Sequence, residues 1–371
     1  MFKQLNQIKT PTLLVDEKKC RQNIFKMVEK SHRLGLELRP HFKTHQSRSI
    51  GEWFKYSGVH RIAVSSLGMA EYFAHARWDD ILVALPVNVL EVDIIQRLTP
   101  RVNLTIVVDN MTALVIMAKK LSTSISIMVE IDVGQHRSGM NWDDTKAIAG
   151  IVDFISSHEN YNFAGFMCHG GQTYQAKSKE EVLAIHEENL AKLNSVTEPY
   201  RSKFPEMIVS YGDTPSCSLS TNFKGVDEIR PGNYVFYDLM QQQIGSCTKE
   251  EIAVATFCPI IGTYPESGKA IIYGGAVHFS KDHLQVNGAP YYGSVVFMTE
   301  NGWEFPDVDI PVVRLSQEHG TIAIPPGYEN KFNIGELVGI VPVHSCLAAS
   351  NMTWYRTLEG GHQLDHMLGN T

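Results

Sequence analysis

Closely spaced cysteines and long apolar runs are both missing from this sequence of 371 residues. Its six cysteines include no CxxC pair, and they lie far apart, at Cys20, Cys168, Cys217, Cys247, Cys258 and Cys346. This spread predicts reduced thiols rather than a disulfide framework, and it leaves a cysteine available as a metal ligand. No apolar stretch reaches the roughly 18 residues that a membrane-spanning helix needs.

Clustered positive charge is also missing. The formal net charge is −7 and the basic residues are scattered, so the sequence lacks the basic patch of a nucleic-acid-binding protein. The N-terminal residues MFKQLNQIKTPTLL lack the apolar core and cleavage site of a signal peptide. Apolar residues make up 43% and charged residues 20%, as in ordinary globular proteins. We therefore expect a cytoplasmic protein with neither nucleic-acid nor membrane partners.

Short β-rich runs alternate with amphipathic helical stretches through the first two thirds of the chain. Eight such runs occur, at 38–41, 61–65, 81–85, 104–108, 126–131, 163–167, 207–210 and 228–230. Apolar residues three and four apart predict helices between them, most clearly at 111–120, 145–157 and 179–196. Strands that alternate with helices form parallel sheets, and eight units of this length predict an α/β fold of the TIM type, a (β/α)₈ barrel.

The pattern changes after about Gly245. β-branched runs at 252–257, 269–273 and 312–315 are separated by proline and glycine rather than by helical stretches. This predicts a mostly antiparallel β-domain. The run at 12–15 precedes the first barrel unit and is expected to add a strand to that domain. We thus predict a barrel at 17–245 and a β-domain at 246–371 together with 1–16.

Polar residues and glycines follow the predicted barrel strands, at the end where such barrels carry their active sites. They are Lys43 in RPHFKTHQ, Arg137 in DVGQHRSG, His169 and Tyr174 in CHGGQTY, Tyr211 and Thr214 in YGDTPS, and Arg230, Gly232 and Asn233 in RPGNYVFYD. Glycines let backbone N–H groups approach an anion, and the loops after strands seven and eight usually bind phosphate. Each residue alone has a structural explanation, such as a surface lysine or a turn glycine. Their shared position favours a phosphorylated ligand with a lysine across from it.

The segments TPTLLVD, RPHFKTHQ, DVGQHRSG and RPGNYVFYD resemble the alanine-racemase-type, fold-type III pyridoxal-phosphate enzymes. Within these the chain resembles the branch of D-threonine aldolases and D-serine dehydratases, over nearly its whole length. The resemblance implies that Lys43 forms the Schiff base with pyridoxal phosphate. We expect neighbouring cations and partial desolvation to favour the neutral amine that attacks a carbonyl.

The same resemblance assigns further roles at the cofactor. It implies that Arg137 contacts the phenolic oxygen, that His169 lies against the ring, and that Thr214, Gly232 and Asn233 hold the phosphate. It places Arg230 opposite the pyridine nitrogen, with Tyr174 as the alternative there. Tyr211 is a cofactor-binding candidate by its position after the seventh run.

A second motif, VPVHSCLAASN, places His344 and Cys346 two residues apart. On a strand both side chains would point to one face, and an imidazole with a thiolate suits Zn²⁺. By spacing alone, a buried cysteine beside a surface histidine is the favoured explanation of the motif. The resemblance favours a metal, because D-serine dehydratases carry a His-x-Cys zinc pair here and the aldolases a His-x-Asp pair. The following LAASNMTWYRTLEGG departs from the family pattern, which leaves the substrate pocket open.

These features predict a β-elimination on a small D-amino acid that carries a β-hydroxyl, with D-serine giving pyruvate and ammonia. Lys43 would take the Cα proton, and a divalent metal, expected to be Zn²⁺, would assist the departure of hydroxide. The alternatives are an aldolase acting on D-threonine or 3-hydroxy-D-aspartate, an amino-acid racemase, a non-catalytic pyridoxal-phosphate carrier, and a barrel without a cofactor. The resemblance also implies a homodimer.

Overall fold

The computed structural model describes residues 7–370, which form two compact units. Of these residues, the barrel unit takes 25–43 and 51–232, and the β unit takes 7–24, 44–50 and 233–370. The chain passes between the units inside helices α1 (Glu17–Arg33) and α2 (Arg48–Tyr56), after Lys43 and after Gly232. No helix in the described part of the chain combines the length and the apolar character that a membrane crossing requires.

The barrel unit contains eight parallel strands. In chain order they are β2 (Glu37–Leu38), β3 (Arg61–Val64), β4 (Asp80–Pro86), β5 (Asn103–Val108), β6 (Ile125–Asp132), β8 (Tyr161–His169), β9 (Ile208–Gly212) and β10 (Glu228–Ile229). Their order in the sheet is β2-β10-β9-β8-β6-β5-β4-β3, and β7 (Met140–Asn141) pairs with β6 beside it. The two ends meet where Ala63 N–H donates to the Pro40 carbonyl (3.0 Å) and Phe42 N–H to the Ala63 carbonyl (2.8 Å). The sheet is therefore a nearly closed barrel, which confirms the predicted fold class.

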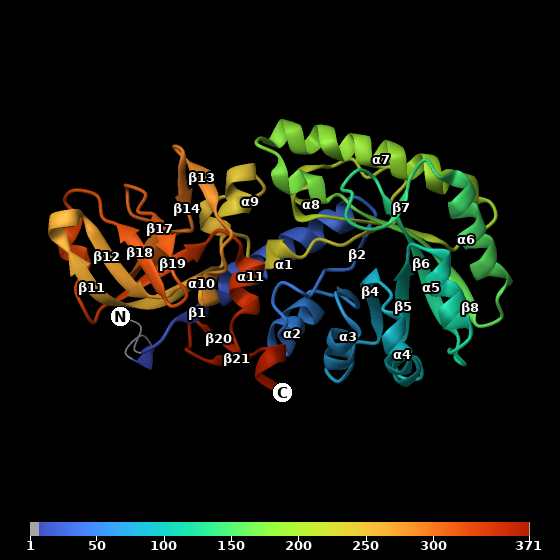
Figure 1. The fold of residues 1–371 in the computed structure, drawn as a ribbon, viewed down its shortest axis with the longest axis horizontal. Coiled ribbons are helices and arrows are strands. Elements are labelled where there is room, and N and C mark those ends of the chain that lie inside the picture. The colour runs from blue at the N-terminus through green and yellow to red at the C-terminus, as the bar shows by residue number, and fades with distance from the viewer. Residues whose placement is uncertain (1–6, 371) are drawn as a thin grey trace. The chain divides into compact units, whose positions relative to one another are not determined.

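Helices lie outside the barrel strands (Figure 1). They are α3 (Leu67–Ala74), α4 (Val92–Leu98), α5 (Met111–Ala118), α6 (Thr145–Ser157), α7 (Lys179–Arg201) and α8 (Thr214–Leu219), with parts of α1 and α2. Side-chain caps fix several of their starts, for example Asn110 on the N–H of Ala113 and Ser178 on that of Glu181. Such caps satisfy backbone N–H groups that have no partner inside the helix.

Part of the barrel interior is apolar. Ala63, Leu82, Val107, Met128 and Met167 form one cluster, each with at most 2% of its surface exposed. Such side chains fill the middle of a barrel, so the interior is a packed core and ligands bind at its ends.

The β unit is built on one large, mostly antiparallel sheet. Its strands are β1 (Thr12–Val15), β11 (Val254–Tyr264), β12 (Lys269–Tyr273), β15 (Gly293–Thr299), β16 (Gly302–Glu304), β17 (Val312–Leu315), β18 (His319–Ala323), β19 (Leu337–Pro342), β20 (Trp354–Thr357) and β21 (Gln363–Asp365). A separate hairpin joins β13 (Leu284–Val286) to β14 (Ala289–Tyr291), and the helices α9 (Leu239–Ile244), α10 (Ala276–Phe279) and α11 (Ser345–Ser350) are short.

β1 confirms the predicted N-terminal contribution to this sheet, since it pairs antiparallel with β11 and parallel with β20. The prediction that residues 1–16 join the β-domain also covers residues 1–6, which lie outside the described residues.

Candidate active site

Lys43 lies in a turn at the end of the first barrel strand. The predicted strand 38–41 is only partly regular, because β2 ends at Leu38 and His41 adds a single bridge to Ala63. Phe42 is fully buried, and its ring centroid lies 5.0 Å from that of Phe73. This packing anchors the turn. Lys43 is exposed in the single chain.

Three cationic side chains, Lys43, Arg137 and Arg230, act on two histidines at this end of the barrel. Burial lowers the pKa of His41 well below its usual value, and Lys43, Arg230, His169 and Arg137 lower it further by charge repulsion. Burial likewise lowers the pKa of His169 to about 3, with Arg137 and Lys43 as the next causes. The positive charges of Lys43, Arg137 and Arg230 therefore act together on His41 and His169 at this end of the barrel.

His169 is held in a defined neutral form at the end of β8. Its Nδ1 donates to the Gly212 carbonyl at 2.6 Å, which leaves Nε2 without the proton. Tyr174 lies near it, with ring centroids 6.2 Å apart, and the Tyr174 hydroxyl accepts the Thr214 N–H at 3.2 Å. A fixed, uncharged ring is suited to packing against a flat aromatic ligand.

The loop after β6 is wound around Asp132. Its Oδ1 accepts the N–H groups of Gly134 (2.9 Å), Gln135 (2.9 Å) and His136 (3.1 Å). This arrangement satisfies the backbone of the DVGQHRSG segment locally and leaves the Arg137 side chain exposed. Arg137 is thus available to an anionic ligand at the barrel mouth.

Tyr211 does not take the predicted position. Its ring is fully buried, with an edge-on contact to His186 at 5.0 Å, and its hydroxyl accepts from Asn189 Nδ2 at 3.3 Å. The side chain is therefore packed inside the protein, where it is closed to a bound ligand. A β-strand alternates its side chains between two faces, and the sequence did not reveal which face Tyr211 occupies.

Thr214 and Gly232 remain candidates for a phosphate site. Thr214 is the first residue of α8 and is fully buried, while Gly232 is half-buried and ends the barrel unit. Gly170 lies close by, where an added Cβ would come within 2.5 Å of Asp213 Oδ2. The backbone at this end is packed so closely that only glycine fits there.

Arg230 lies at the end of β10 with 5% of its surface exposed. Its Nη2 donates to the Cys168 carbonyl at 2.7 Å and its Nη1 donates to the Ser210 hydroxyl. Burial lowers the pKa of Arg230, and Glu228 opposes that effect. Ser210 and Glu228 are linked to Arg230 at this site but were not among the predicted residues. Both residues could have been recognised from the sequence, because they are polar residues within strands of a barrel whose interior is usually apolar.

The residues at the barrel mouth fit pyridoxal phosphate. Burial is the main cause of the lowered pKa of His41 and His169, and Lys43, Arg137 and Arg230 lower both values further, so this end of the barrel carries positive charge that suits a phosphorylated phenolate. A lysine, a neutral imidazole ring, a threonine hydroxyl and a glycine-containing loop are the groups that such a cofactor needs.

The second motif lies in the β unit, in a different conformation from the predicted strand. β19 ends at Pro342, His344 is the residue before α11, and Cys346 is the second residue of that helix. The helix starts here because Asp238 Oδ2 accepts the Ser345 N–H at 2.9 Å. Although burial opposes both shifts, Cys346 raises the pKa of His344 and His344 lowers the pKa of Cys346, so the two side chains nevertheless lie close together.

The surroundings of this pair favour a thiolate. Burial raises the pKa of Cys346, but the hydrogen bond and charge of His344 and the Thr44 hydroxyl outweigh it and lower the pKa. Thr44 Oγ1 lies 3.3 Å from the sulfur and Asn233 Nδ2 lies 3.5 Å from it. Asn233 Nδ2 also donates to Asp238 Oδ2 at 2.6 Å and to Ser345 Oγ at 3.0 Å, so this amide is engaged within the β unit and the backbone of Asn233 remains the candidate for the predicted phosphate contact.

His344 is oriented by a carboxylate. Its Nδ1 lies 2.7 Å from Asp282 Oδ2, and metal-binding histidines commonly make such a contact with their second nitrogen. Between residues 7 and 370 there is no group of three or more His, Cys, Asp or Glu side chains arranged to hold a metal. Two protein ligands fit an open, catalytic type of zinc site better than a closed structural one.

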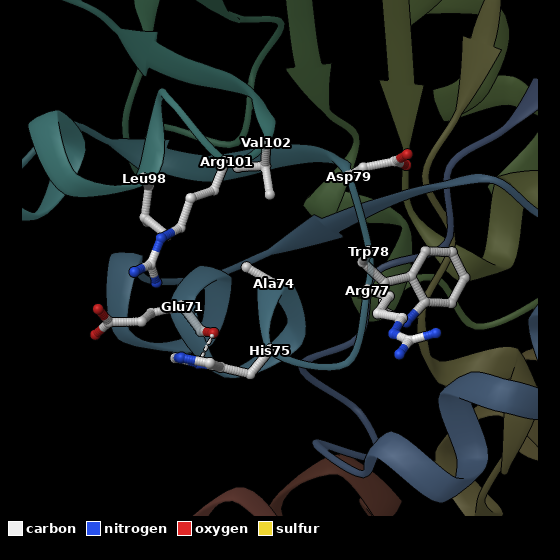
Figure 2. A pocket seen from close by; sticks show the side chains of 9 residues that line it. All are labelled: Glu71, Ala74, His75, Arg77, Trp78, Asp79, Leu98, Arg101 and Val102. Atoms are coloured by element: carbon white, nitrogen blue, oxygen red, sulfur yellow. Dashed lines mark hydrogen bonds between the residues drawn. The ribbon is translucent and has the colours of Figure 1, made fainter.

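Two cavities of the barrel unit lie away from these residues. One, of about 310 Å³, has Glu71 and Arg101 on one side and Arg77 and Trp78 on the other (Figure 2). The other, of about 510 Å³, is lined by residues at or near the first positions of the strands, such as Arg61, Asp80 and Asn103. None of the predicted site residues lines either cavity, so neither is the candidate active site.

The comparisons with known proteins agree with this architecture. Residues 15–239 match the family "Alanine racemase, N-terminal domain", and residues 253–358 match the "Putative serine dehydratase domain". The D-serine dehydratase of Dictyostelium discoideum is 30% identical, with 97% of this chain and 96% of that protein aligned. The 3-hydroxy-D-aspartate aldolase of Paracoccus denitrificans (strain Pd 1222) is 24% identical, over 96% and 90% of the two chains.

A solved structure gives the same result. The D-threo-3-hydroxyaspartate dehydratase of Delftia sp. HT23 superposes with a TM-score of 0.89 at 27% identity, and 98% of each chain is covered. In two further structures of that enzyme one residue is replaced by alanine, a histidine in the first and a cysteine two positions later in the second. The cysteine mutant is in a metal-free form. The present chain therefore belongs to the alanine-racemase-type, fold-type III pyridoxal-phosphate enzymes, in the branch that carries a serine dehydratase domain.

Proposed function

We propose that this protein is a lyase, dependent on pyridoxal phosphate and a divalent metal, that removes water from a D-amino acid with a β-hydroxyl. D-serine is the favoured substrate, and it would yield pyruvate and ammonia. The observation that carries this proposal is the His344–Cys346 pair with Asp282 beside the imidazole. The barrel of the same protein gathers Lys43 with three further cationic or imidazole groups.

The barrel residues would bind and orient the reacting groups. When bound, pyridoxal phosphate supplies an electron sink for the electron pair that the Cα proton leaves behind. Lys43 Nζ would accept that proton. Lys43 is one of the charged side chains that act on His169. His169 keeps its own proton on Nδ1 through the Gly212 carbonyl, so its ring stays neutral against the ligand.

The β-unit residues would act on the leaving group. His344 and Cys346 would hold the metal, whose Lewis-acid character makes hydroxide a better leaving group. Cys346 Sγ contacts Thr44, and Thr44 follows Lys43 directly in the chain.

The relatives support the same reaction type. Both the Dictyostelium enzyme and the Delftia enzyme are dehydratases, and in the latter a cysteine replacement accompanies a metal-free form. A homodimer of this chain is part of the proposal and rests on the family resemblance. An aldolase is the second candidate because 3-hydroxy-D-aspartate aldolases are also similar. Cys346 disfavours it, since the resemblance associates aldolases with aspartate at that position.

The test is to incubate purified protein with D-serine and pyridoxal phosphate and to measure pyruvate, with and without a chelator. Pyruvate that disappears with the chelator and returns with Zn²⁺ supports the proposal. D-threo-3-hydroxyaspartate and D-threonine are assayed in parallel, because glycine as the product identifies an aldolase. A protein that binds the cofactor but forms from none of these substrates a 2-oxo acid with the substrate's full carbon chain would contradict the dehydratase function.

A second experiment addresses the metal ligands. The double variant His344→Ala/Cys346→Ala is expected to lose elimination by at least about 100-fold while it still binds the cofactor. Full elimination by the metal-free double variant would exclude the proposed role of the metal.

A further inference from the structure

The barrel interior contains a continuous chain of buried polar groups between Arg230 and Asp80. Arg230 Nη1 donates to Ser210 Oγ, and Ser210 Oγ donates to Glu228 Oε1. Glu228 Oε2 accepts from Arg39 Nε at 2.7 Å, and Arg39 Nη1 donates to Asp80 Oδ1 at 2.6 Å. All five residues belong to the barrel unit.

The hydrogen-bond directions in this chain are fixed. The guanidinium groups of Arg230 and Arg39 can only donate, and an ionised Glu228 can only accept. The single proton of the Ser210 hydroxyl must therefore point to Glu228, and its oxygen must accept from Arg230. Ser210 thus aligns Arg230, and Glu228 aligns Ser210.

Burial makes this arrangement costly unless every charge is satisfied. Ser210 and Glu228 are completely buried, while Arg39 and Arg230 are 4% and 5% exposed. Burial raises the pKa of Glu228, but Arg39, Ser210 and Arg230 outweigh burial and keep the carboxylate ionised. This series of hydrogen-bonded side chains reaches solvent at Asp80, whose side chain is 21% exposed. Asp80 lines the 510 Å³ cavity together with Arg61.

These hydrogen-bonded polar groups lie in a barrel whose interior is otherwise partly apolar. One side of the interior is filled by the apolar cluster around Met128, as in most barrels. The strands β9 and β10 instead place Ser210 and Glu228 directly opposite each other in register. Replacing buried ion pairs by apolar residues often leaves stability unchanged or raises it, so stability alone does not explain this polar side.

We propose that Ser210 and Glu228 are positioning residues of the cofactor site, which hold the Arg230 guanidinium in one orientation toward the ring of the bound cofactor. Arg39 and Asp80 complete the chain by keeping Glu228 in place. This inference rests on the proposed binding of pyridoxal phosphate.

The experiment compares the Ser210→Ala variant with Ser31→Ala, a control in the same unit. Ser31 is equally buried and its hydroxyl donates to the Val28 carbonyl at 2.8 Å, outside the chain of polar groups. Each protein is titrated with pyridoxal phosphate, and the dissociation constant, the absorbance spectrum of the loaded protein and the thermal midpoint are recorded.

Ser210→Ala is expected to bind pyridoxal phosphate about ten-fold more weakly, because a buried guanidinium loses one charge-assisted hydrogen bond. Its absorbance maximum is expected to shift, while Ser31→Ala keeps the wild-type spectrum and affinity. A lowered thermal midpoint without either change would show a merely structural role and would overturn the proposal.

Glu228→Gln provides a second variant, with the same expected spectral shift. If it fails to fold, Ser210→Ala decides alone. Wild-type protein that takes up no pyridoxal phosphate would overturn the proposed function and this inference together. Wild-type uptake with an unchanged Ser210→Ala variant overturns this inference only.

Discussion

His344 Nδ1 and Asp282 Oδ2 lie 2.7 Å apart, although 62 residues separate them in the chain. Asp282 follows the short helix α10, and His344 precedes α11. The carboxylate fixes which imidazole nitrogen carries the proton and leaves the other nitrogen for a metal.

Asp282→Ala is therefore expected to weaken metal binding by about 10- to 100-fold. The apparent affinity for Zn²⁺ is measured by competition with a chelator of known affinity. Asp307→Ala is the matched control, because Asp307 is an exposed carboxylate of the same unit. Equal affinities of the two variants would refute the orienting role of Asp282.

Lys43→Ala is expected to abolish covalent capture of the cofactor and to lower elimination by at least about 100-fold, since both attachment and proton transfer need the amine. Capture is measured by borohydride reduction followed by mass spectrometry. Lys146→Ala, on the exposed side of α6, is the control and should capture the cofactor as wild type does. Capture at another lysine in Lys43→Ala would contradict the assignment.

His169 predicts a pH dependence of stability. Its pKa is about 3 in the folded protein, against 6.5 for an ordinary histidine, mainly because of burial. Between these values the unfolded chain binds the extra proton, so the free energy of unfolding decreases as the pH falls from about 6.5 toward 3.

His169→Asn should reduce this dependence, because asparagine can still donate to the Gly212 carbonyl but does not titrate. Urea unfolding at pH 7 and pH 5 measures the difference. Asp213, whose pKa burial raises to about 6, titrates in both proteins and so cancels from the comparison. The same pH slope in both proteins would show that His169 is not the responsible group.

Gly165→Ala should be strongly destabilising, by about 2–4 kcal/mol. Gly165 has a φ of +127°, and an added Cβ would lie 2.0 Å from the Ile208 carbonyl oxygen in β9. Gly150→Ala, in α6, is the control because no atom lies within 4 Å of its added Cβ. That change should stabilise the helix by about 0.5–1 kcal/mol. Chemical denaturation of both variants measures these effects, and equal stabilities would contradict the packing argument.

Local patterns were sufficient to predict several elements of the fold. The helix at 145–157 and the strands at 12–15, 269–273 and 312–315 occur with the predicted bounds. Apolar periodicity is a local property, and it depends on which face of an element is buried. The predicted strand at His344 and Cys346 is wrong because Asp238, more than 100 residues earlier, caps the Ser345 N–H and starts a helix there.

The sequence by itself determined the class of fold, the family and the residue types that a cofactor and a metal require. Those depend on order along the chain and on motifs such as RPHFKTHQ and VPVHSC. Only the tertiary structure decided that Tyr211 is buried against His186, that Asn233 turns to Cys346, and that Ser210 and Glu228 hold Arg230. These relationships depend on side-chain direction and on contacts between distant segments, and neither is set by local periodicity.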